Sequence, residues 1–246
     1  MSICLQLDVG NSSAKWRLLK DGAVLSRGFY NATDTQSQRE LQESADQVDE
    51  IWVSSVAGGD TEAELTEMLL QRWDVTPWFA RTSAATGQLR NSYADPTRMG
   101  IDRWLAMLGA RERWSKRLCV VDAGSALTID LVSASGQHEG GYIIPGPALM
   151  ERALLLDTDR VRFAEDVSYN LAPGVSTAEA VRHGIALAQV GSLVAVLDAC
   201  QDEMPLLVFC GGGGQTLMNL LGRGGEHAPD LVFEGLELMA ALSDRS

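Results

Sequence analysis

Two stretches of the chain repeat one pattern of apolar and polar positions. Apolar runs at residues 3–7 and 118–121 each lead into an aspartate, a glycine and a hydroxyl-bearing residue. Apolar runs of this length, bounded by turn residues, predict buried β-strands. Asp8 corresponds to Asp122 and Gly10 to Gly124, so the same strand-and-turn construction is expected twice.

The first repeat predicts three strands, a helix, a strand and a second helix, over residues 3–9, 14–19, 24–30, 35–45, 50–56 and 62–73. Asp21-Gly22 is a strong hairpin signal, and Asp60 is expected to cap the helix over 62–73. A short strand is expected at 78–80. Residues 82–98 are polar and irregular, which predicts a loop, and loops of this length are more often functional than idle.

The second repeat follows a helix expected at 99–114. It predicts strands over 118–121, 126–132, 138–144, 205–210 and 231–233, and helices over 148–156, 176–200, from 215, and over 235–242. The repeated order indicates an α/β fold of two similar domains, residues 1–116 and 117–246, meeting at a cleft. Strand ends at such a cleft are where α/β sheets bind ligands.

Composition narrows the class of ligand. The formal net charge of −13 argues against a nucleic-acid partner, and it requires that a bound phosphate be neutralised locally. No apolar stretch is expected to approach the roughly 20 residues of a membrane span, and no signal peptide is evident, so we expect no membrane partner and a cytoplasmic protein. The cysteines form no C-x-x-C pair, which favours buried, reduced thiols.

The turn from Asp8 to Lys15 has the residue types of a phosphate site. Gly10 allows a tight turn and a close approach to phosphate, and Lys15 supplies a positive charge. Asp8 is a hard oxygen ligand suited to Mg²⁺. Further donors come from the backbone and from Asn11, Ser12 and Ser13. The local alternative is a β-bulge with a solvated lysine; the Walker pattern G-x-x-x-x-G-K-[ST] is absent.

The second turn offers a matching set. Gly124, Ser125 and Thr128 are candidates to hold phosphates from the opposite side, and Asp122 is a candidate cation ligand. Asp130 follows on the same expected strand. It is either a site residue or simply an exposed strand residue.

A third element, Gly100-Ile101-Asp102-Arg103, opens the helix after the long loop. Backbone N–H groups at a helix start attract anions, and a carboxylate is favoured in the first turn. On local grounds alone, the segment is a helix acid followed by a surface arginine.

Tyr93-x-x-Pro96-x-x-Met99-Gly100-x-Asp102-Arg103 resembles the signature of the type III pantothenate kinases. Three further patterns of that family are matched in order: D-x-G-N-[ST]-x-x-K at 8–15, D-x-G-[TS]-A-x-T at 122–128, and G-G-x-I-x-P-G at 140–146. The resemblance runs from residue 3 to about 236. Met99 replaces a usual leucine, Ser125 a common threonine, and residues 176–180 match the family's N-T-x-x-A segment only loosely.

The resemblance implies transfer of the γ-phosphoryl group of ATP to the 4′-hydroxyl of pantothenate, the first step toward coenzyme A. It implies two ribonuclease-H-like halves, as in acetate kinase, hexokinase and actin, with the nucleotide in a central cleft. It also implies a homodimer that needs Mg²⁺ and a monovalent cation, K⁺ or NH₄⁺.

Roles carry over to the matching positions. Asp102 is the expected general base, Arg103 meets the substrate carboxylate or the moving phosphoryl charge, and Asp122 binds K⁺. The expected pantothenate pocket consists of Tyr93, Gly100, Ile101, Asp102, Arg103 and Thr177. The expected nucleotide and Mg²⁺ site consists of Asp8, Val9, Gly10, Asn11, Ser12, Ser13, Ala14, Lys15 and Ser125. Residues 211–214 either approach the adenosine or form an ordinary glycine-rich loop.

Two other functions remain open from the sequence. The chain could phosphorylate another small alcohol or sugar, or it could be an ATP-binding regulator without transfer chemistry. The intact segment 100–103 argues against the regulator.

Overall fold

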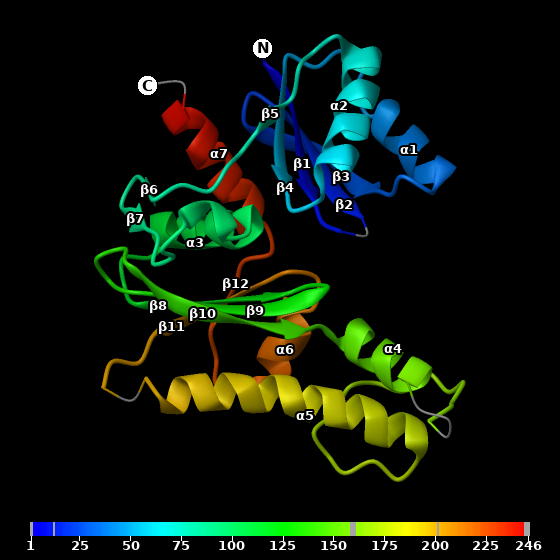
Figure 1. Cartoon of the computed structure of the whole chain (residues 1–246), viewed down its shortest axis with the longest axis vertical. Helices are drawn as coiled ribbons and strands as arrows, with labels where there is room; N and C mark the ends of the chain where they lie inside the picture. The colour runs from blue at the N-terminus through cyan, green and yellow to red at the C-terminus, as the bar shows by residue number, and fades with distance from the viewer. Residues whose placement is uncertain (1, 12, 158–160, 201, 244–246) are drawn as a thin grey trace. The chain divides into compact units, whose positions relative to one another are not determined.

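The computed structural model describes residues 2–11, 13–157, 161–200 and 202–243 (Figure 1). Its contacts divide the chain into two compact units. Unit 1 consists of Met1–Gly87, Tyr93–Gly109 and Val232–Ser246, and unit 2 of Gln88–Ser92 and Ala110–Leu231. The predicted boundary between residues 116 and 117 stays a prediction, since these units do not cut the chain at one position.

Unit 1 is built on a mixed sheet with strand order β3-β2-β1-β4-β5. The strands are β1 Ile3–Val9, β2 Ala14–Lys20, β3 Ala23–Tyr30, β4 Glu50–Ser55 and β5 Trp78–Phe79. The helices are α1 Thr35–Gln42, α2 Gly59–Trp73, α3 Ile101–Arg113 and α7 Leu231–Ser243, with short elements β6 Ala85–Thr86, β7 Leu89–Arg90 and η1 Pro96–Arg98. β1 runs antiparallel to β2 and parallel to β4.

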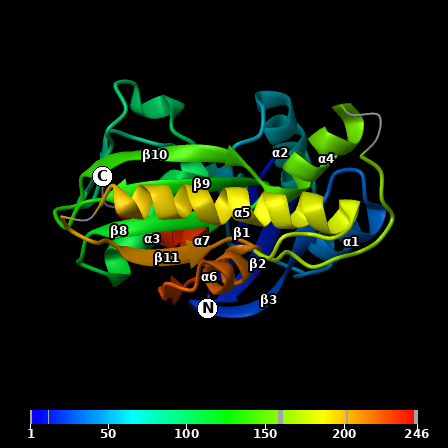
Figure 2. The same ribbon diagram turned by 90° about the horizontal axis from the view of Figure 1, so that it is seen from below.

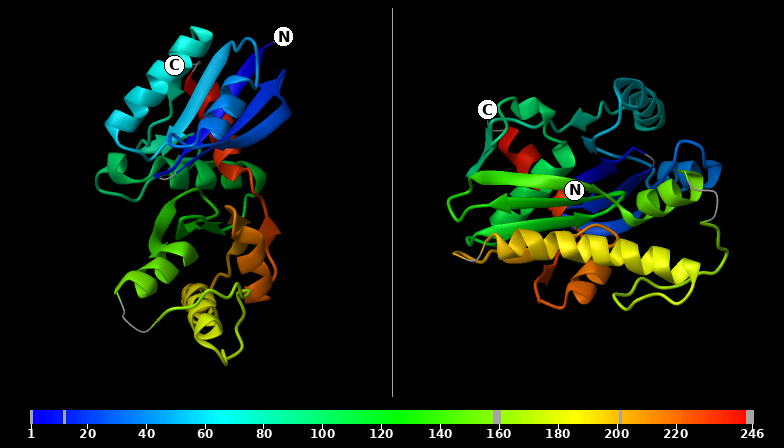
Figure 3. Two further views of the ribbon diagram at one scale, coloured as in Figure 1. Left: turned by 90° about the vertical axis from the view of Figure 1, so that its right-hand side faces the viewer. Right: turned by 60° about the horizontal axis from the view of Figure 1, so that its bottom comes forward.

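Alternation along β1 explains how this sheet is covered. Leu5 and Leu7 enter a core with Leu41 of α1 and Leu69 of α2. Gln6 points to the other face, where it and Arg17 of β2 bind Glu237 of α7. The C-terminal helix therefore belongs to unit 1, and Figure 3 shows it in red beside the blue strands.

Unit 2 repeats the same topology, with strand order β10-β9-β8-β11-β12. Its strands are β8 Leu118–Ala123, β9 Ala126–Val132, β10 His138–Pro145, β11 Leu206–Cys210 and β12 Glu226–His227, and its helices are α4 Pro147–Asp157, α5 Thr177–Asp198 and α6 Gly214–Leu221. Leu127 and Ile129 of β9 pack with Leu193 of α5 and Leu217 of α6. Figure 2 shows α5 lying along the strands. The predicted duplication is present.

The two hairpin turns form where the glycines predicted them. Gly22 has φ +80° and Gly136 has φ +88°, a region that side chains rarely adopt. Each glycine lies between the second and third strand of its sheet.

Four local predictions were wrong. Residues 231–233 form the first turn of α7, because these apolar side chains pack as a helix after the Pro229-Asp230 turn. Gly58, without a side-chain hydrogen bond, is the N-cap of α2, so Asp60 lies inside the helix. The loop 82–98 contains the short pair β6–β7. Asp130 is 1% exposed, so it is not an exposed strand residue.

Among the described residues, α5 is the one helix whose length and hydropathy would be sufficient to span a membrane, contrary to the expectation from sequence that no apolar stretch approaches that length. Its buried residues, including Val190, Leu193 and Leu197, pack against the sheet of unit 2. Packing in a core accounts for its apolar composition. All four cysteines are buried as well.

Candidate active site

The turn from Asp8 to Lys15, the first acidic turn, is closed by a backbone hydrogen bond of Gly10. The Gly10 N–H donates to the Ser13 carbonyl (3.0 Å), and a Cβ at Gly10 would lie 3.3 Å from that oxygen. Asp8 and Lys15 are direct partners across β1 and β2. The side chains of Asn11 and Ser13 are exposed and available to a ligand, whereas Ser12 lies outside the described residues.

Val9 and Ala14 flank this turn but face inward. Both side chains are buried in the core of unit 1, and the Val9 carbonyl accepts a hydrogen bond from the Val56 N–H. Their contribution to a nucleotide site is therefore limited to backbone groups and to the shape of the turn.

Asp8 has an unusual environment. Its Oδ1 accepts a hydrogen bond from the Ser54 hydroxyl of β4 (3.0 Å). Burial, and then the negative charge of Asp102, raise the pKa of Asp8 to about 6, although Ser54 and Lys15 oppose the shift. Two carboxylates from distant parts of the sequence thus lie near each other in unit 1.

The start of α3 explains how Asp102 reaches this place. Asp102 Oδ1 accepts a hydrogen bond from the Arg103 N–H (2.8 Å), so the carboxylate folds back over the helix start. A Cβ at Gly100 would collide with that same oxygen. Glycine at position 100 is required for this side-chain position, which is a steric reason for the Gly100-x-Asp102 pattern.

Arg103 is held beside Tyr93. Arg103 is 4% exposed. Its guanidinium donates from Nη1 to the Tyr93 hydroxyl (2.9 Å) and lies 5.8 Å from the tyrosine ring centroid. The local alternative of a surface arginine is therefore excluded, while the substrate role of Arg103 stays a prediction. Ile101 is buried, so only its backbone can face a substrate.

The two carboxylates suit Mg²⁺ that arrives with a nucleotide. Mg²⁺ prefers hard oxygen ligands and is usually held by one or two carboxylates together with substrate phosphates and water. Within the described part of the chain, no group of three or more His, Cys, Asp or Glu side chains is placed to hold a metal ion. Asp8 and Asp102 fit a metal that the phosphates also coordinate.

The second acidic turn, in unit 2, is enclosed by glycines. The Gly124 N–H donates to the Ala126 carbonyl (2.9 Å), and the Gly146 N–H donates to the Ser125 carbonyl (3.0 Å). A Cβ at Gly211, which has φ +76°, would collide with the Asp122 carboxylate. Asp122 therefore offers an oxygen ligand beside backbone that approaches closely, and Ser125 is exposed. A cation at Asp122 would need further oxygens from its ligand or from water.

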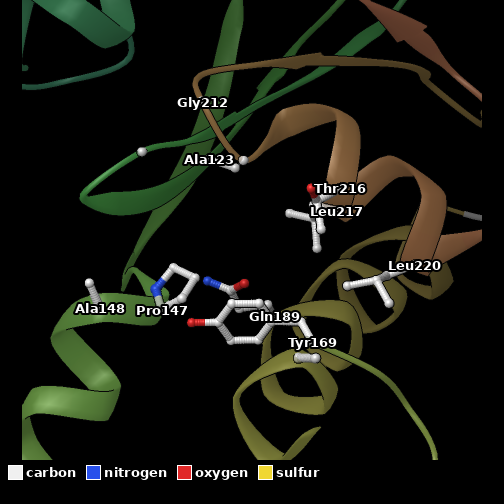
Figure 4. Close-up of a pocket in the computed structure, with 12 residues that line it drawn as sticks. Ala123, Pro147, Ala148, Tyr169, Gln189, Gly212, Thr216, Leu217 and Leu220 are labelled. Carbon is white, nitrogen blue, oxygen red and sulfur yellow. The ribbon is translucent and has the colours of Figure 1, made fainter. Parts of the chain in front are cut away.

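A cavity of about 380 Å³ adjoins this turn (Figure 4). It is lined by Ala123, Gly124, Pro147, Ala148, Tyr169, Ala186, Gln189, Gly212, Gly213, Thr216, Leu217 and Leu220. Gln189 of α5 is 6% exposed, and its Nε2 has no hydrogen-bond partner among the residues that the structure describes. A buried donor without a partner is costly, which points to a ligand with an acceptor at this position.

Sequence reasoning missed Tyr169, Gln189 and Thr216. One signal was present: Gln189 is a polar residue on the buried side of an otherwise apolar stretch of helix. Thr177, which was predicted, lies at the start of α5 beside a separate apolar groove rather than this cavity.

Comparison with known proteins gives consistent matches. Residues 4–199 match the model of the type III pantothenate kinase family. The chain is 36% identical to the type III pantothenate kinase of Thiobacillus denitrificans over all of both chains, and 34% identical to that of Hahella chejuensis over 96% of each.

Solved structures share the fold. A Baf family protein from Campylobacter jejuni superposes with TM-score 0.61 at 24% identity, covering 98% of this chain and 100% of that one. Component A of (R)-2-hydroxyglutaryl-CoA dehydratase from Acidaminococcus fermentans superposes with TM-score 0.50 at 16% identity, covering 99% and 97%. These similarities, with two mixed five-stranded sheets of one topology, confirm the predicted α/β fold with two similar halves.

Proposed function

Since the chain belongs to the type III pantothenate kinase family, which phosphorylates pantothenate with ATP in the first step of coenzyme A biosynthesis, we propose a role for each site residue in that reaction. The observation that carries the proposal is the meeting of Asp8 with Asp102 beside the Arg103–Tyr93 pair. Phosphoryl transfer to a hydroxyl needs a carboxylate base for the hydroxyl and a carboxylate ligand for the metal-bound phosphate, and the two must lie close together.

Asp102 is the general base. As the 4′-oxygen of pantothenate bonds to the γ-phosphorus, its proton passes to the Asp102 carboxylate, the bond from that phosphorus to the β-phosphate oxygen breaks, and ADP leaves. Arg103, held by Tyr93, meets the pantothenate carboxylate or the charge on the moving phosphoryl group. Gly100 and Ile101 supply backbone at the same helix start. Thr177 is the least supported member of this set.

The phosphates of ATP are held mainly by the turns. Asn11, Ser13 and Lys15 serve the first turn and Ser125 the second, while Ser12, outside the described residues, stays an expectation from sequence. Asp8 holds Mg²⁺, which supplies charge neutralisation for the phosphates, and Asp122 holds K⁺ or NH₄⁺. Local neutralisation of this kind is required in a protein of net charge −13.

The adenosine occupies the cavity beside the second turn. Apolar side chains from α6 and Tyr169 provide the surface that a base needs, and Gln189 supplies a donor. The close approach of Gly211 and Gly213 to Ala123 brings backbone against this cavity, which favours the adenosine role for residues 211–214 over that of an ordinary loop.

The test is an assay for 4′-phosphopantothenate with the purified chain, ATP and Mg²⁺, with and without K⁺. We expect product that depends on the monovalent cation. Asp122→Asn should raise the K⁺ concentration needed for half-maximal rate, and an unchanged K⁺ curve would remove Asp122 from the cation site. A panel of small alcohols and sugars separates this reaction from phosphorylation of another acceptor.

A homodimer in the cytoplasm completes the proposal. An apolar groove of about 1040 Å³ lies between α4 and α5 and is lined by exposed leucines, among them Leu149, Leu154 and Leu156. Exposed apolar patches of this kind mark interaction surfaces, and a second copy is the occupant that the family resemblance implies.

A further inference from the structure

A buried polar pair lies on β9 and β10, away from the residues assigned above. His138 Nε2 is 3.0 Å from Asp130 Oδ1, and both residues are 1% exposed. Neighbouring residues of β9, Leu127 and Ile129, alternate with Asp130 and face the helices α5 and α6. The pair therefore lies on the sheet face opposite that core.

The other nitrogen of the histidine reaches an exposed segment. His138 Nδ1 is 2.8 Å from the Ser92 hydroxyl, so Asp130, His138 and Ser92 form one chain of hydrogen bonds within unit 2. Residues 88–92 follow the β9–β10 hairpin, since the Arg90 N–H donates to the Gly136 carbonyl (2.9 Å). At Gly136, a Cβ would collide with the Gln88 carbonyl, so backbone passes directly over backbone there.

Stability alone is a weak explanation for such a pair. A buried carboxylate–histidine pair loses hydration, and well-packed apolar residues often stabilise a fold equally well. A buried, hydrogen-bonded pair does, however, fix the position of the next group that hydrogen-bonds to it. Here the group that it binds is the hydroxyl of a residue on a connecting segment.

The anchored segment ends next to a substrate residue. Ser92 is followed by Tyr93, whose hydroxyl accepts from Arg103, and consecutive Cα atoms are held about 3.8 Å apart by the peptide bond. Fixing Ser92 thus limits the backbone positions open to Tyr93. We propose that Asp130 and His138 are positioning residues that act through Ser92 to hold Tyr93 for pantothenate binding. This inference rests on the proposed substrate role of Tyr93 and Arg103.

Ser92→Ala tests the inference, because Ser92 is exposed and its loss leaves the core intact. We expect KM for pantothenate to rise about tenfold, the equivalent of one lost hydrogen bond, with kcat and KM for ATP within about twofold of wild type. Ser92→Thr keeps the hydroxyl and should restore the wild-type KM. Ser135→Ala is the matched control, since it removes an exposed, hydrogen-bonded serine hydroxyl at the tip of the same hairpin and should change neither constant.

A double-mutant cycle examines the buried end. Asp130→Leu should raise KM for pantothenate as Ser92→Ala does, and the double variant should resemble either single variant, since all three break one chain of contacts. Independent, additive effects would overturn the inference. If Asp130→Leu fails to fold, the Ser92 series decides alone.

Tyr93→Phe separates this inference from the function on which it rests. An unchanged KM for pantothenate in Tyr93→Phe rejects the substrate role of Tyr93. A raised KM in Tyr93→Phe with an unchanged KM in Ser92→Ala leaves that role standing and overturns the positioning role of Asp130 and His138.

Discussion

At the scale of single residues, the meeting of Asp8 and Asp102 is the feature with the clearest physical consequence. Asp8 loses hydration at the end of β1 and lies near a second carboxylate, and both effects disfavour its ionised form. A folded chain without Mg²⁺ therefore holds a carboxylate that would be more stable in the unfolded state. The proposed role of Asp8 as a Mg²⁺ ligand explains why the site keeps this charge.

Asp8→Asn should make the metal-free protein more stable at neutral pH. The pKa of Asp8 is about 6 in the folded chain against its ordinary value of 3.8, so the folded state binds the proton more tightly. Stability from this group is present below about pH 4 and is lost as the pH rises through 6. The variant should gain on the order of 1–3 kcal/mol in the free energy of unfolding at pH 7.5. Below about pH 4, where Asp8 is protonated in both states, it should gain nothing.

Urea unfolding in EDTA at pH 3.5 and pH 7.5 measures this gain. The asparagine Oδ1 keeps the acceptor for Ser54, so the hydrogen bond is not a confounding loss. Equal stability of both proteins at pH 7.5 would contradict the raised pKa. The variant should also lose activity, because the proposed Mg²⁺ ligand is gone.

Asp102→Asn should lower kcat by about 10² or more while the fold is kept, because the amide cannot accept the proton of the substrate hydroxyl. Asp60→Asn is a matched control: Asp60 is an exposed acid in the first turn of α2. Steady-state kinetics measure the turnover of both variants, and circular dichroism checks that each keeps its fold. Turnover within threefold of wild type would remove Asp102 from the mechanism.

These residues could be chosen from the sequence, but their contacts could not. Asp8 and Asp102 are far apart in the chain, and no local pattern reports the pKa that results from their meeting. The burial of Asp130 and Arg103 was likewise missed, since a polar residue type predicts exposure and only a tertiary partner reverses it.

At the scale of elements, the hydrophobic pattern predicted the central strands of both sheets, since β1, β8 and β11 are apolar runs that each end beside a glycine, whereas the short polar strand β12 was not predicted. The exceptions have local causes. Residues 231–233 are apolar and β-prone, but they form the first turn of α7, because tertiary contacts override propensity in so short a segment. The cavity beside α5 could not be predicted, since its lining comes from five separate stretches of chain.

Gln189→Leu tests that cavity. We expect KM for ATP to rise about fivefold to tenfold, the equivalent of one hydrogen bond to the base, with KM for pantothenate unchanged. The nucleotide-free protein should not be destabilised, because the variant removes a buried donor that has no partner within the described structure. Gln215→Leu, at an exposed position of the neighbouring helix α6, is the control. A variant with unchanged KM for ATP would show that adenosine binds elsewhere.

At the scale of the whole molecule, the apolar groove between α4 and α5 remains to be explained. The groove between α4 and α5 lies in unit 2, and Leu156 at its edge is 71% exposed. Unit 1 has exposed apolar residues too, among them Leu25 and Phe29 on the edge strand β3. A groove lined by several leucines buries more apolar area when a partner binds, and association there is therefore more favourable.

Leu156→Glu should therefore weaken self-association, because a carboxylate in an apolar interface loses its hydration without gaining a partner. Sedimentation velocity at micromolar concentration should show the wild-type chain as a dimer and the variant shifted toward monomer. Leu25→Glu makes the same change at an exposed leucine of β3 and should remain a dimer. A wild-type monomer would reject the homodimer, whereas a dimer disrupted only by Leu25→Glu would move its interface to β3.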